Sequence, residues 1–207
     1  MVKSTTDYGQ FIGNKFQPSA DGNRIEVENP SDHSIIGTVP AGCSQDALKA
    51  IDLAKKAQPE WAKKPAVQRA AVLKGMANVI RDNRDALIET LVKEQNKVID
   101  LASVEVDCTA EYLDMYAGMA RMYDTGEMIP SDNPSEQIYL HRIPIGVSVG
   151  ICPWNFPMFG KDLSPSFLIL FFVNFSNHCD LVFELYSLGT QDCARALSRM
   201  YRRGKDQ

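Results

Sequence analysis

The sequence predicts an α/β protein, and three patterns carry that prediction. Residues 8–40 show short apolar stretches separated by Gly, Asn and Pro, which is typical of short antiparallel strands. From 44 to 123, apolar residues recur every three or four positions, which indicates amphipathic helices. Strand-like stretches return at 137–143 and 147–151. Helices of this kind need a sheet or other helices to cover their apolar faces.

The bulk composition narrows the class of protein. The chain has 207 residues, a formal charge of −4 and 44% hydrophobic residues, as expected for one or two soluble domains. The acidic balance provides no basic patch for nucleic acid. No stretch reaches the roughly 18–20 apolar residues of a membrane span. The five cysteines show no paired spacing and the N-terminus lacks the apolar core of a signal peptide, so we expect reduced thiols and a cytoplasmic location. The three histidines are scattered, and we expect no metal site.

The first strands are expected at 11–12, 25–27 and 35–39. Gly13 and Asn14 follow the first apolar pair and predict a tight turn. Charged residues alternate with Ile25 and Val27 in the next stretch. These features predict an antiparallel sheet with a structural role.

Four helices are predicted between 44 and 123. The first begins with Ser44 as its N-cap and ends at Pro59, and the second follows Pro65. The third begins near Asn83 and ends at Asn96. Asn is second only to Gly at the left-handed position that closes many helices, so we expect a left-handed backbone at Asn96.

The fourth helix is the longest and carries one apolar stripe. The members of the stripe recur at helical spacing: Leu101, Val104, Cys108, Tyr112, Met115, Met119 and Met122. Glu105 and the other charged residues fall off this stripe. Core packing is its expected role, because Met readily fills irregular gaps. A groove for a partner is the alternative, and Cys108 is expected to be an inert buried thiol.

The strands at 137–143 and 147–151 are expected to pair as a hairpin through a turn at Ile145 and Gly146. An isolated hairpin is only marginally stable in water. It is therefore expected to pair with another subunit or with a distant part of the same chain.

The second of these strands runs into a turn that contains Cys152-Pro-Trp-Asn-Phe-Pro157. Pro153 and Pro157 each hold φ near about −65° and favour extended geometry in the residue before them. This arrangement presents the Asn155 amide, which offers two N–H donors. A fixed donor at the end of a strand is what an oxyanion hole requires. The alternative is a rigid connection in which Asn155 caps its own turn.

Residues 143–157 read Ile-Pro-Ile-Gly-Val-Ser-Val-Gly-Ile-Cys-Pro-Trp-Asn-Phe-Pro. They resemble the segment that precedes the cofactor-binding strands of NAD(P)-dependent aldehyde dehydrogenases, and are most similar to the lactaldehyde and glycolaldehyde type. The resemblance covers about residues 8–159. It implies that Asn155 stabilises the thiohemiacetal oxyanion. It also implies that Ile151, Cys152, Pro153 and Trp154 line the nicotinamide end of NAD or NADP.

The resemblance further implies a fold and a division of the chain. Residues 1–130 would form the N-terminal part of the cofactor-binding domain, with short antiparallel strands and four helices. Residues 131–157 would form the hairpin arm and the Pro-Trp-Asn turn, and residues 158–207 a divergent tail. The expected reaction is oxidation of a small aldehyde to a carboxylic acid. The 137–151 hairpin would mediate homo- or hetero-oligomers.

The resemblance ends after Phe159. The Lys-Pro-Ser-Glu turn that holds the adenosine ribose in the family is not found, so the parallel cofactor-binding sheet is expected to be missing or incomplete. We hypothesise that the tail is read from a shifted frame or a retained intron. The Phe-rich run at 167–175 is expected to be prone to aggregation. Its alternative role is a buried strand that stands in for part of that sheet.

The nucleophilic Cys and the general-base Glu of the family lie further along the family's chain than residue 207. Cys152, Cys179 and Cys193 do not stand in the sequence context of that nucleophile. We therefore expect the chain alone to be inactive, because an oxyanion donor without a nucleophile has nothing to stabilise. The alternative function is a non-catalytic product that pairs with a full-length subunit.

Overall fold

The structure is a computed structural model with α/β architecture. The residues it describes are 6–7, 9–123, 125–144, 146–150, 155–158 and 170–172. The predicted Ile151, Cys152, Pro153 and Trp154 lie outside them. Within the described part, no helix combines the length and the hydrophobicity that a bilayer crossing requires.

The N-terminal hairpin confirms the predicted tight turn. Strand β2 (Gln10–Ile12) pairs antiparallel with β3 (Lys15–Gln17). The two residues between them, Gly13 and Asn14, have φ of 61° and 62°. Positive φ at both positions defines the turn type whose twist suits a two-residue hairpin, and Gly and Asn are the residues that adopt it most readily.

A second group of strands forms a three-stranded sheet. Strand β4 (Arg24–Glu28) pairs antiparallel with β5 (Ile35–Pro40), as predicted. In the observed register Val27 lies opposite Gly37. Strand β1 (Thr6–Asp7) adds to the other edge of β5 in parallel orientation. The sequence did not predict β1, because two residues are too few to show an alternating pattern.

Helix α1 spans Ser44–Ala62, and both of its predicted ends are corrected. Its N-cap is Cys43 rather than Ser44, since the Asp46 carboxylate turns back to accept the Cys43 backbone N–H at 3.1 Å. Pro59 lies inside the helix. Pro59 has no N–H to donate to the preceding turn, but its carbonyl accepts the Lys63 N–H at 3.3 Å and the helix continues to Ala62.

Asp46 fastens α1 to the strand region. Its buried carboxylate also accepts the Ala20 N–H at 3.1 and 3.2 Å. Burial raises the pKa of Asp46, but hydrogen bonds from the backbone of Cys43 and Ala20 outweigh it and lower the pKa below its ordinary value of 3.8. The charged form of Asp46 is therefore stabilised by folding.

Asp46→Asn is expected to lower the free energy of unfolding by about 1.5–3 kcal/mol at neutral pH, because it weakens bonds to a charged acceptor. A lowered folded-state pKa means that the stabilisation is present above the unfolded pKa and is lost as pH falls through the folded pKa. The difference between the unchanged chain and Asp46→Asn should therefore shrink below about pH 4. Urea unfolding at several pH values measures it, with the exposed Asp52→Asn on the same helix as control. An equal difference at every pH would contradict the assignment.

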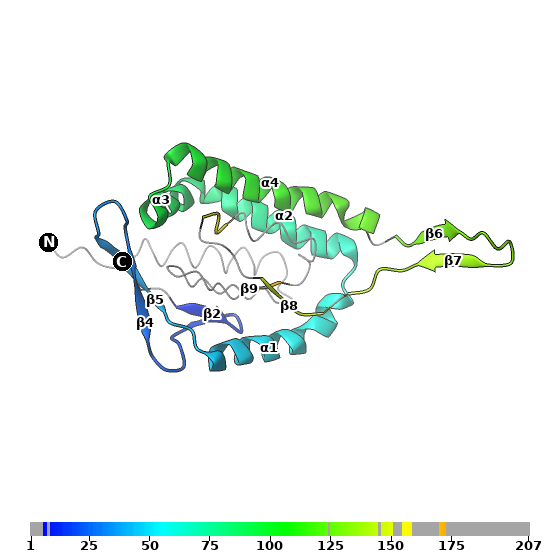
Figure 1. Cartoon of the computed structure of the whole chain (residues 1–207), viewed down its shortest axis with the longest axis horizontal. Coiled ribbons are helices and arrows are strands. Elements are labelled where there is room, and N and C mark those ends of the chain that lie inside the picture. Colours follow the sequence, from blue (N-terminus) through cyan, green and yellow to red (C-terminus); the bar gives the residue numbers. More distant parts are fainter. Residues whose placement is uncertain are drawn as a thin grey trace.

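Helices α2 (Ala66–Asp82) and α3 (Arg84–Gln95) confirm the predicted boundaries. The second follows Pro65, and Asn83 separates it from the third. Asn96 closes α3 with φ 53° and ψ 33°, the predicted left-handed conformation. The chain then turns into α4 (Ile99–Tyr123), which packs along α2 (Figure 1).

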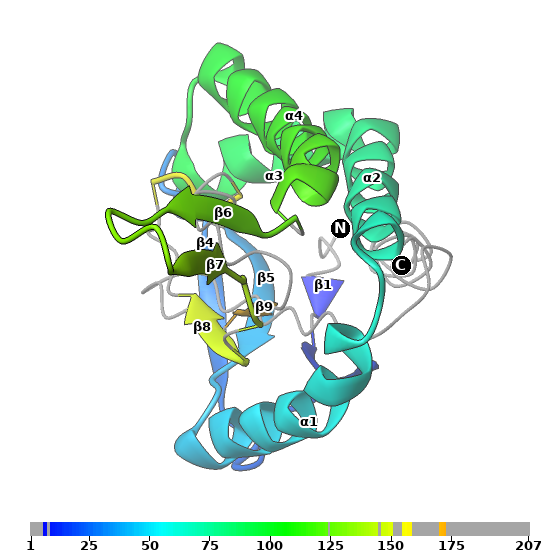
Figure 2. The same ribbon diagram turned by 90° about the vertical axis from the view of Figure 1, so that its right-hand side faces the viewer.

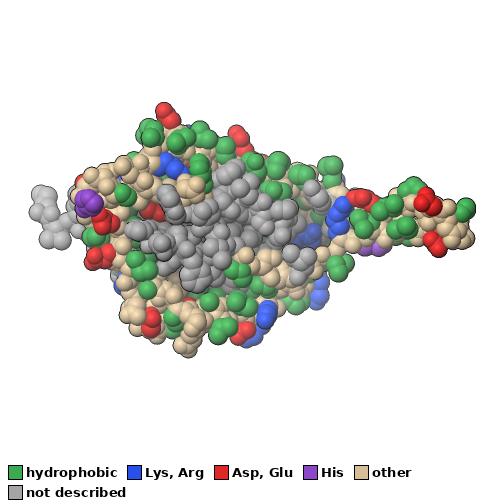
Figure 3. Space-filling model, in the orientation of Figure 1, with side chains coloured by type: hydrophobic (Ala, Val, Ile, Leu, Met, Phe, Trp, Pro, Cys, Tyr) green, Lys and Arg blue, Asp and Glu red, His purple; other side chains and the backbone are tan. Residues whose placement is uncertain are grey.

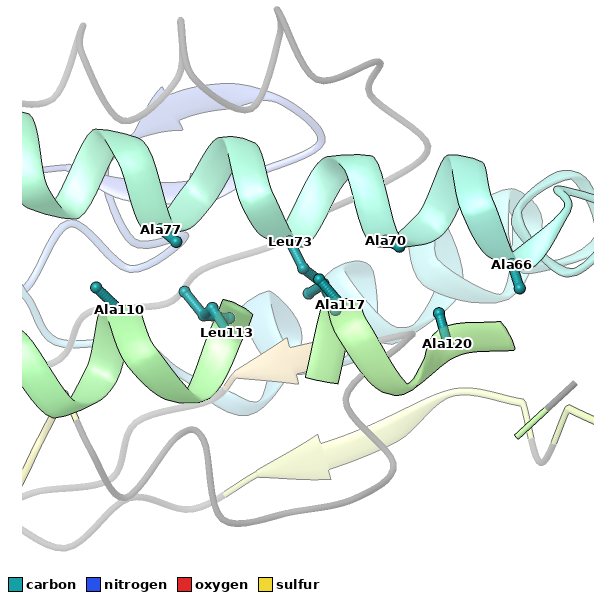
Figure 4. Close-up of a cluster of buried hydrophobic side chains, with 8 residues drawn as sticks. All are labelled: Ala66, Ala70, Leu73, Ala77, Ala110, Leu113, Ala117 and Ala120. Atoms are coloured by element: carbon teal, nitrogen blue, oxygen red, sulfur yellow. The ribbon is translucent and has the colours of Figure 1, made fainter. Parts of the chain in front are cut away.

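The interface between α2 and α4 is lined by small side chains. Its members are Ala66, Ala70, Leu73, Ala77, Ala110, Leu113, Ala117 and Ala120. Figure 4 shows the two rows facing each other, with Leu73 and Leu113 between the alanines. Alanine keeps the two helix backbones close together, so the two leucines fill most of the remaining space.

This interface overturns the prediction for the apolar stripe of α4. The buried face instead comprises Ala102, Glu105, Val106, Thr109, Ala110, Leu113, Ala117 and Ala120. Leu101, Val104, Met115 and Met122 are exposed, and hydrophobic side chains lie at the surface along the upper edge of Figure 3. Cys108 is half-buried rather than fully buried. The close approach of α2 selected the face with small residues over the face with large ones.

The predicted hairpin of 137–143 with 147–151 is also wrong. Strand β7 (Gln137–Leu140) pairs antiparallel with β6 (Glu127–Pro130) instead. The loop between them closes on itself, because the Asn133 carbonyl accepts the Glu136 N–H at 3.0 Å. After β7, Pro144 has no N–H to donate to a ladder. All residues of β6 and β7 are exposed, and the hairpin projects from one end of the protein (Figure 1).

Strand β8 (Ser148–Gly150) pairs in parallel with β9 (Leu170–Phe172). Three residues of the Phe-rich run thus form a strand. The burial that the alternative prediction assigned to this strand stays a prediction. Figures 1 and 2 both place this pair between α1 and the α2–α4 pair. The described part of the chain therefore contains two strands of a parallel sheet with helices on either side.

Candidate active site

The predicted oxyanion donor lies in a turn beside the N-terminal part of α4. The turn comprises residues 155–158. Asn155 is exposed, and its side-chain carboxamide makes no hydrogen bond to the described residues. The backbone carbonyl of the same residue, by contrast, is bound by a charged side chain.

Lys97 holds the first residue of the turn. Its ammonium group donates to the carbonyl oxygen of Asn155 at 2.6 Å. The same nitrogen lies 4.1 Å from the centre of the Phe156 ring, which is a cation–π distance. Lys97 directly follows Asn96, so the left-handed turn after α3 sets where this side chain starts.

Glu105 holds the last residue of the turn. Its Oε1 accepts the backbone N–H of Met158 at 2.8 Å, and its Oε2 accepts from Lys97 at 2.5 Å. The side chain of Glu105 is 0% exposed and that of Lys97 is 9% exposed. Burying a carboxylate raises the free energy of the folded state unless the group is paired and hydrogen-bonded. Here Lys97 supplies the opposite charge and the Met158 N–H supplies a second hydrogen bond.

Apolar packing adds a third attachment. The Met158 side chain packs against the buried cluster of Ile88, Leu91, Ala102 and Val106, which joins α3 to α4. The bidentate pair of Arg84 with Asp107, at 2.7 and 2.8 Å, braces the same two helices. The turn therefore packs where α3 and α4 are joined by both apolar contacts and an ion pair.

Neither Lys97 nor Glu105 was predicted as a site residue from the sequence. Glu105 was assigned to the polar side of α4, because charged residues are rarely buried. A signal was present in the small residues: on both helices they recur, with one Leu each, every three or four positions, at 66, 70, 73 and 77 on α2 and at 110, 113, 117 and 120 on α4. Extended back by one and two turns, this pattern places Glu105 beside Ala102 and Thr109 on the buried face.

Other chemistry-bearing groups do not form a site in the described part of the chain. No group of His, Cys, Asp or Glu side chains there has the arrangement of a metal site. The Cys43 thiol donates to Asp46 at 3.4 Å, as part of the start of α1. The 155–158 turn and its two charged anchors are therefore the candidate site.

Comparison with known proteins gives this geometry its context. A sequence profile of the aldehyde dehydrogenase family matches residues 16–161, a range that includes Lys97, Glu105 and the turn. The chain belongs to this family. It is 43% identical to the lactaldehyde dehydrogenase of Escherichia coli (strain K12) over 146 residues, which are 70% of this chain and 30% of that protein.

Solved aldehyde dehydrogenase structures share the fold. The crystal structure of lactaldehyde dehydrogenase from Escherichia coli matches with a TM-score of 0.75 and 35% identity, covering 95% of this chain and 39% of that one. A betaine aldehyde dehydrogenase from Staphylococcus aureus in complex with NAD+ matches with a TM-score of 0.73 and 26% identity, covering 95% and 39%. The chain thus spans about a third of the length of the curated relatives it matches, and corresponds to an N-terminal portion of the aldehyde dehydrogenase fold.

Proposed function

We propose that this chain carries the oxyanion-donor portion of an aldehyde-oxidising site. In this proposal, the Asn155 side-chain N–H donates to the oxygen of the aldehyde as negative charge develops on it. The observation that supports it is a turn whose backbone is bound by Lys97 and Glu105 while its one carboxamide is exposed. Preorganised donors of this kind stabilise a developing oxyanion without reorganising during the reaction.

The proposal includes NAD or NADP as the oxidant. Ile151, Cys152, Pro153 and Trp154 would line its nicotinamide end, directly before Asn155 in the chain. An exposed neutral amide beside that segment fits this use, because it adds no charge next to the nicotinamide. The cofactor, when bound, would accept hydride from the substrate carbon. The contribution of Asn155 is to hold the substrate oxygen and to favour its charged form.

One relative supports a substrate class for this proposal. The lactaldehyde dehydrogenase of Escherichia coli is named for a small hydroxyaldehyde. We propose a small aldehyde of this type as the substrate and the corresponding carboxylic acid as the product. The nucleophile and the general base would come from family positions that this chain does not match.

A chimera tests the proposal. Residues 16–161 of this chain replace the matching segment of the Escherichia coli lactaldehyde dehydrogenase, and NAD(P)H formation from lactaldehyde is followed. We expect the chimera to turn over and Asn155→Ala to remove most of its activity. The 207-residue chain assayed alone is expected to show no turnover. A folded chimera without activity, or one indifferent to Asn155→Ala, would overturn the oxyanion role.

A second function is supported by the projecting hairpin of β6 and β7. Met128 and Tyr139 are paired across it and both are exposed. Among the described residues, the two strands of this hairpin pair only with each other, so their outer edges can accept a further strand. Figure 3 shows hydrophobic side chains along this arm. We propose that the arm pairs with a full-length aldehyde dehydrogenase subunit.

Co-purification with a tagged full-length lactaldehyde dehydrogenase tests this pairing. We expect the unchanged chain to be retained and the double variant Met128→Asp/Tyr139→Asp to lose most of the binding, since it places charge on an apolar contact face. Asp132→Asn in the exposed loop at the tip is the control and should bind normally. Failure of the unchanged chain to co-purify would end the pairing hypothesis.

A further inference from the structure

The 155–158 turn presents two backbone groups of opposite kind to the helical layer. The Asn155 carbonyl can only accept a hydrogen bond, and the Met158 N–H can only donate one. Lys97 meets the first at 2.6 Å and Glu105 meets the second at 2.8 Å. Lys97 is thus the donor that the Asn155 carbonyl requires, and Glu105 is the acceptor that the Met158 N–H requires.

The two anchors also bind each other. The distance from the Lys97 nitrogen to Glu105 Oε2 is 2.5 Å, and both side chains are almost completely buried. Hydrogen bonds to charged groups are shorter and stronger than those between neutral groups. The pair thus joins the two ends of the turn through one buried bridge, and the contact of Lys97 with the Phe156 ring restricts the residue between them.

We propose that Lys97 and Glu105 are positioning residues for Asn155. They bind the backbone on both sides of the turn, and so they set where the Asn155 carboxamide stands without contacting the substrate. The importance of this positioning for catalysis rests on the proposed function of Asn155. The positioning itself is independent of that function, because it can be measured in the 207-residue chain without any activity.

Amide hydrogen exchange of Met158 in the full chain is the first test. Glu105→Ala removes the acceptor, and we expect exchange of the Met158 N–H to become about ten- to a hundred-fold faster. The Leu113 amide in α4 reports on global opening and should change much less. Glu105→Gln, which keeps an acceptor oxygen, should give an intermediate increase, and it replaces Glu105→Ala if that variant does not fold.

A charge exchange separates positioning from ion-pair stability. The double variant Lys97→Glu/Glu105→Lys keeps both charges, but it offers an acceptor to the Asn155 carbonyl and a donor to the Met158 N–H. We expect it to release the turn as fully as Glu105→Ala does. The matched control exchanges Glu89 and Lys93, an exposed pair on α3 with an N–O distance of 2.6 Å, and should leave Met158 unchanged.

The active chimera provides the catalytic test. Lys97→Met should lower kcat about ten-fold or more with a smaller change in KM, and it should add little to the loss caused by Asn155→Ala, because both act on the same group.

The positioning proposal is overturned if Met158 exchange is unaffected by Glu105→Ala or rises only as much as that of Leu113. If Met158 exchange responds but Asn155→Ala leaves activity intact, the positioning holds and the oxyanion role of Asn155 fails.

Discussion

Replacing Asn155 by Ala in the active chimera is expected to lower kcat about a hundred- to a thousand-fold, the usual loss when one oxyanion donor is removed. In the proposed role, the carboxamide would bind the substrate oxygen most strongly once charge has developed on it. The loss should therefore appear in kcat and in kcat/KM together, with KM changed little. Steady-state kinetics with lactaldehyde and saturating cofactor measures both quantities.

Two further variants sharpen this result. Asn155→Asp keeps the shape but replaces the donor with a negative charge beside the developing oxyanion, so it should be at least as impaired as Asn155→Ala. Asn133→Ala, which alters an exposed turn residue of the hairpin loop, should retain full activity. Near-normal kcat in Asn155→Asp would show that residue 155 does not act as a donor.

Leu113→Ala is expected to produce the largest loss of stability, about 2–5 kcal/mol in the free energy of unfolding. Leu113 is 1% exposed at the centre of the interface between α2 and α4. Its neighbours there are mostly alanines, whose side chains cannot extend into the space that the substitution leaves (Figure 4). The loss should therefore include a large cavity term as well as the lost burial of the side chain.

The matched control lies on the same helix. Met115 is 45% exposed on the opposite side of α4, so Met115→Ala should cost about 1 kcal/mol or less. Chemical denaturation of both variants and of the unchanged chain gives the comparison. A larger cost for Met115→Ala than for Leu113→Ala would restore the original prediction that the methionine stripe forms the core.

The local features of the chain were predictable because neighbouring residues decide them. Gly13 and Asn14 form the predicted turn and Asn96 the predicted left-handed cap, and all three have positive φ, which Gly and Asn tolerate better than most residue types. The helix boundaries near Pro65 and Asn83 follow from the same kind of local rule. The segment around Asn155 also led from the sequence to the aldehyde dehydrogenase family, which the profile match confirms.

The errors arose where distant parts of the chain compete. Periodicity showed that α4 has two distinct faces, but both contain apolar residues, and only the packing against α2 selected the alanine face. The strand 137–140 found its partner in 127–130 because the intervening loop closes its own hydrogen bonds, a preference that strand patterns do not report.

The sequence by itself determined the presence of the four helices, the turns at Gly13, Asn14 and Asn96, and the choice of Asn155 as candidate donor, because each depends on side chains close together in the chain. The tertiary structure alone decided that Glu105 is buried and that it works with Lys97. Their contacts with the turn span 53 and 58 residues of sequence. A buried charge is stable only when partners from elsewhere in the fold meet it, so its role appears only when those partners are in place.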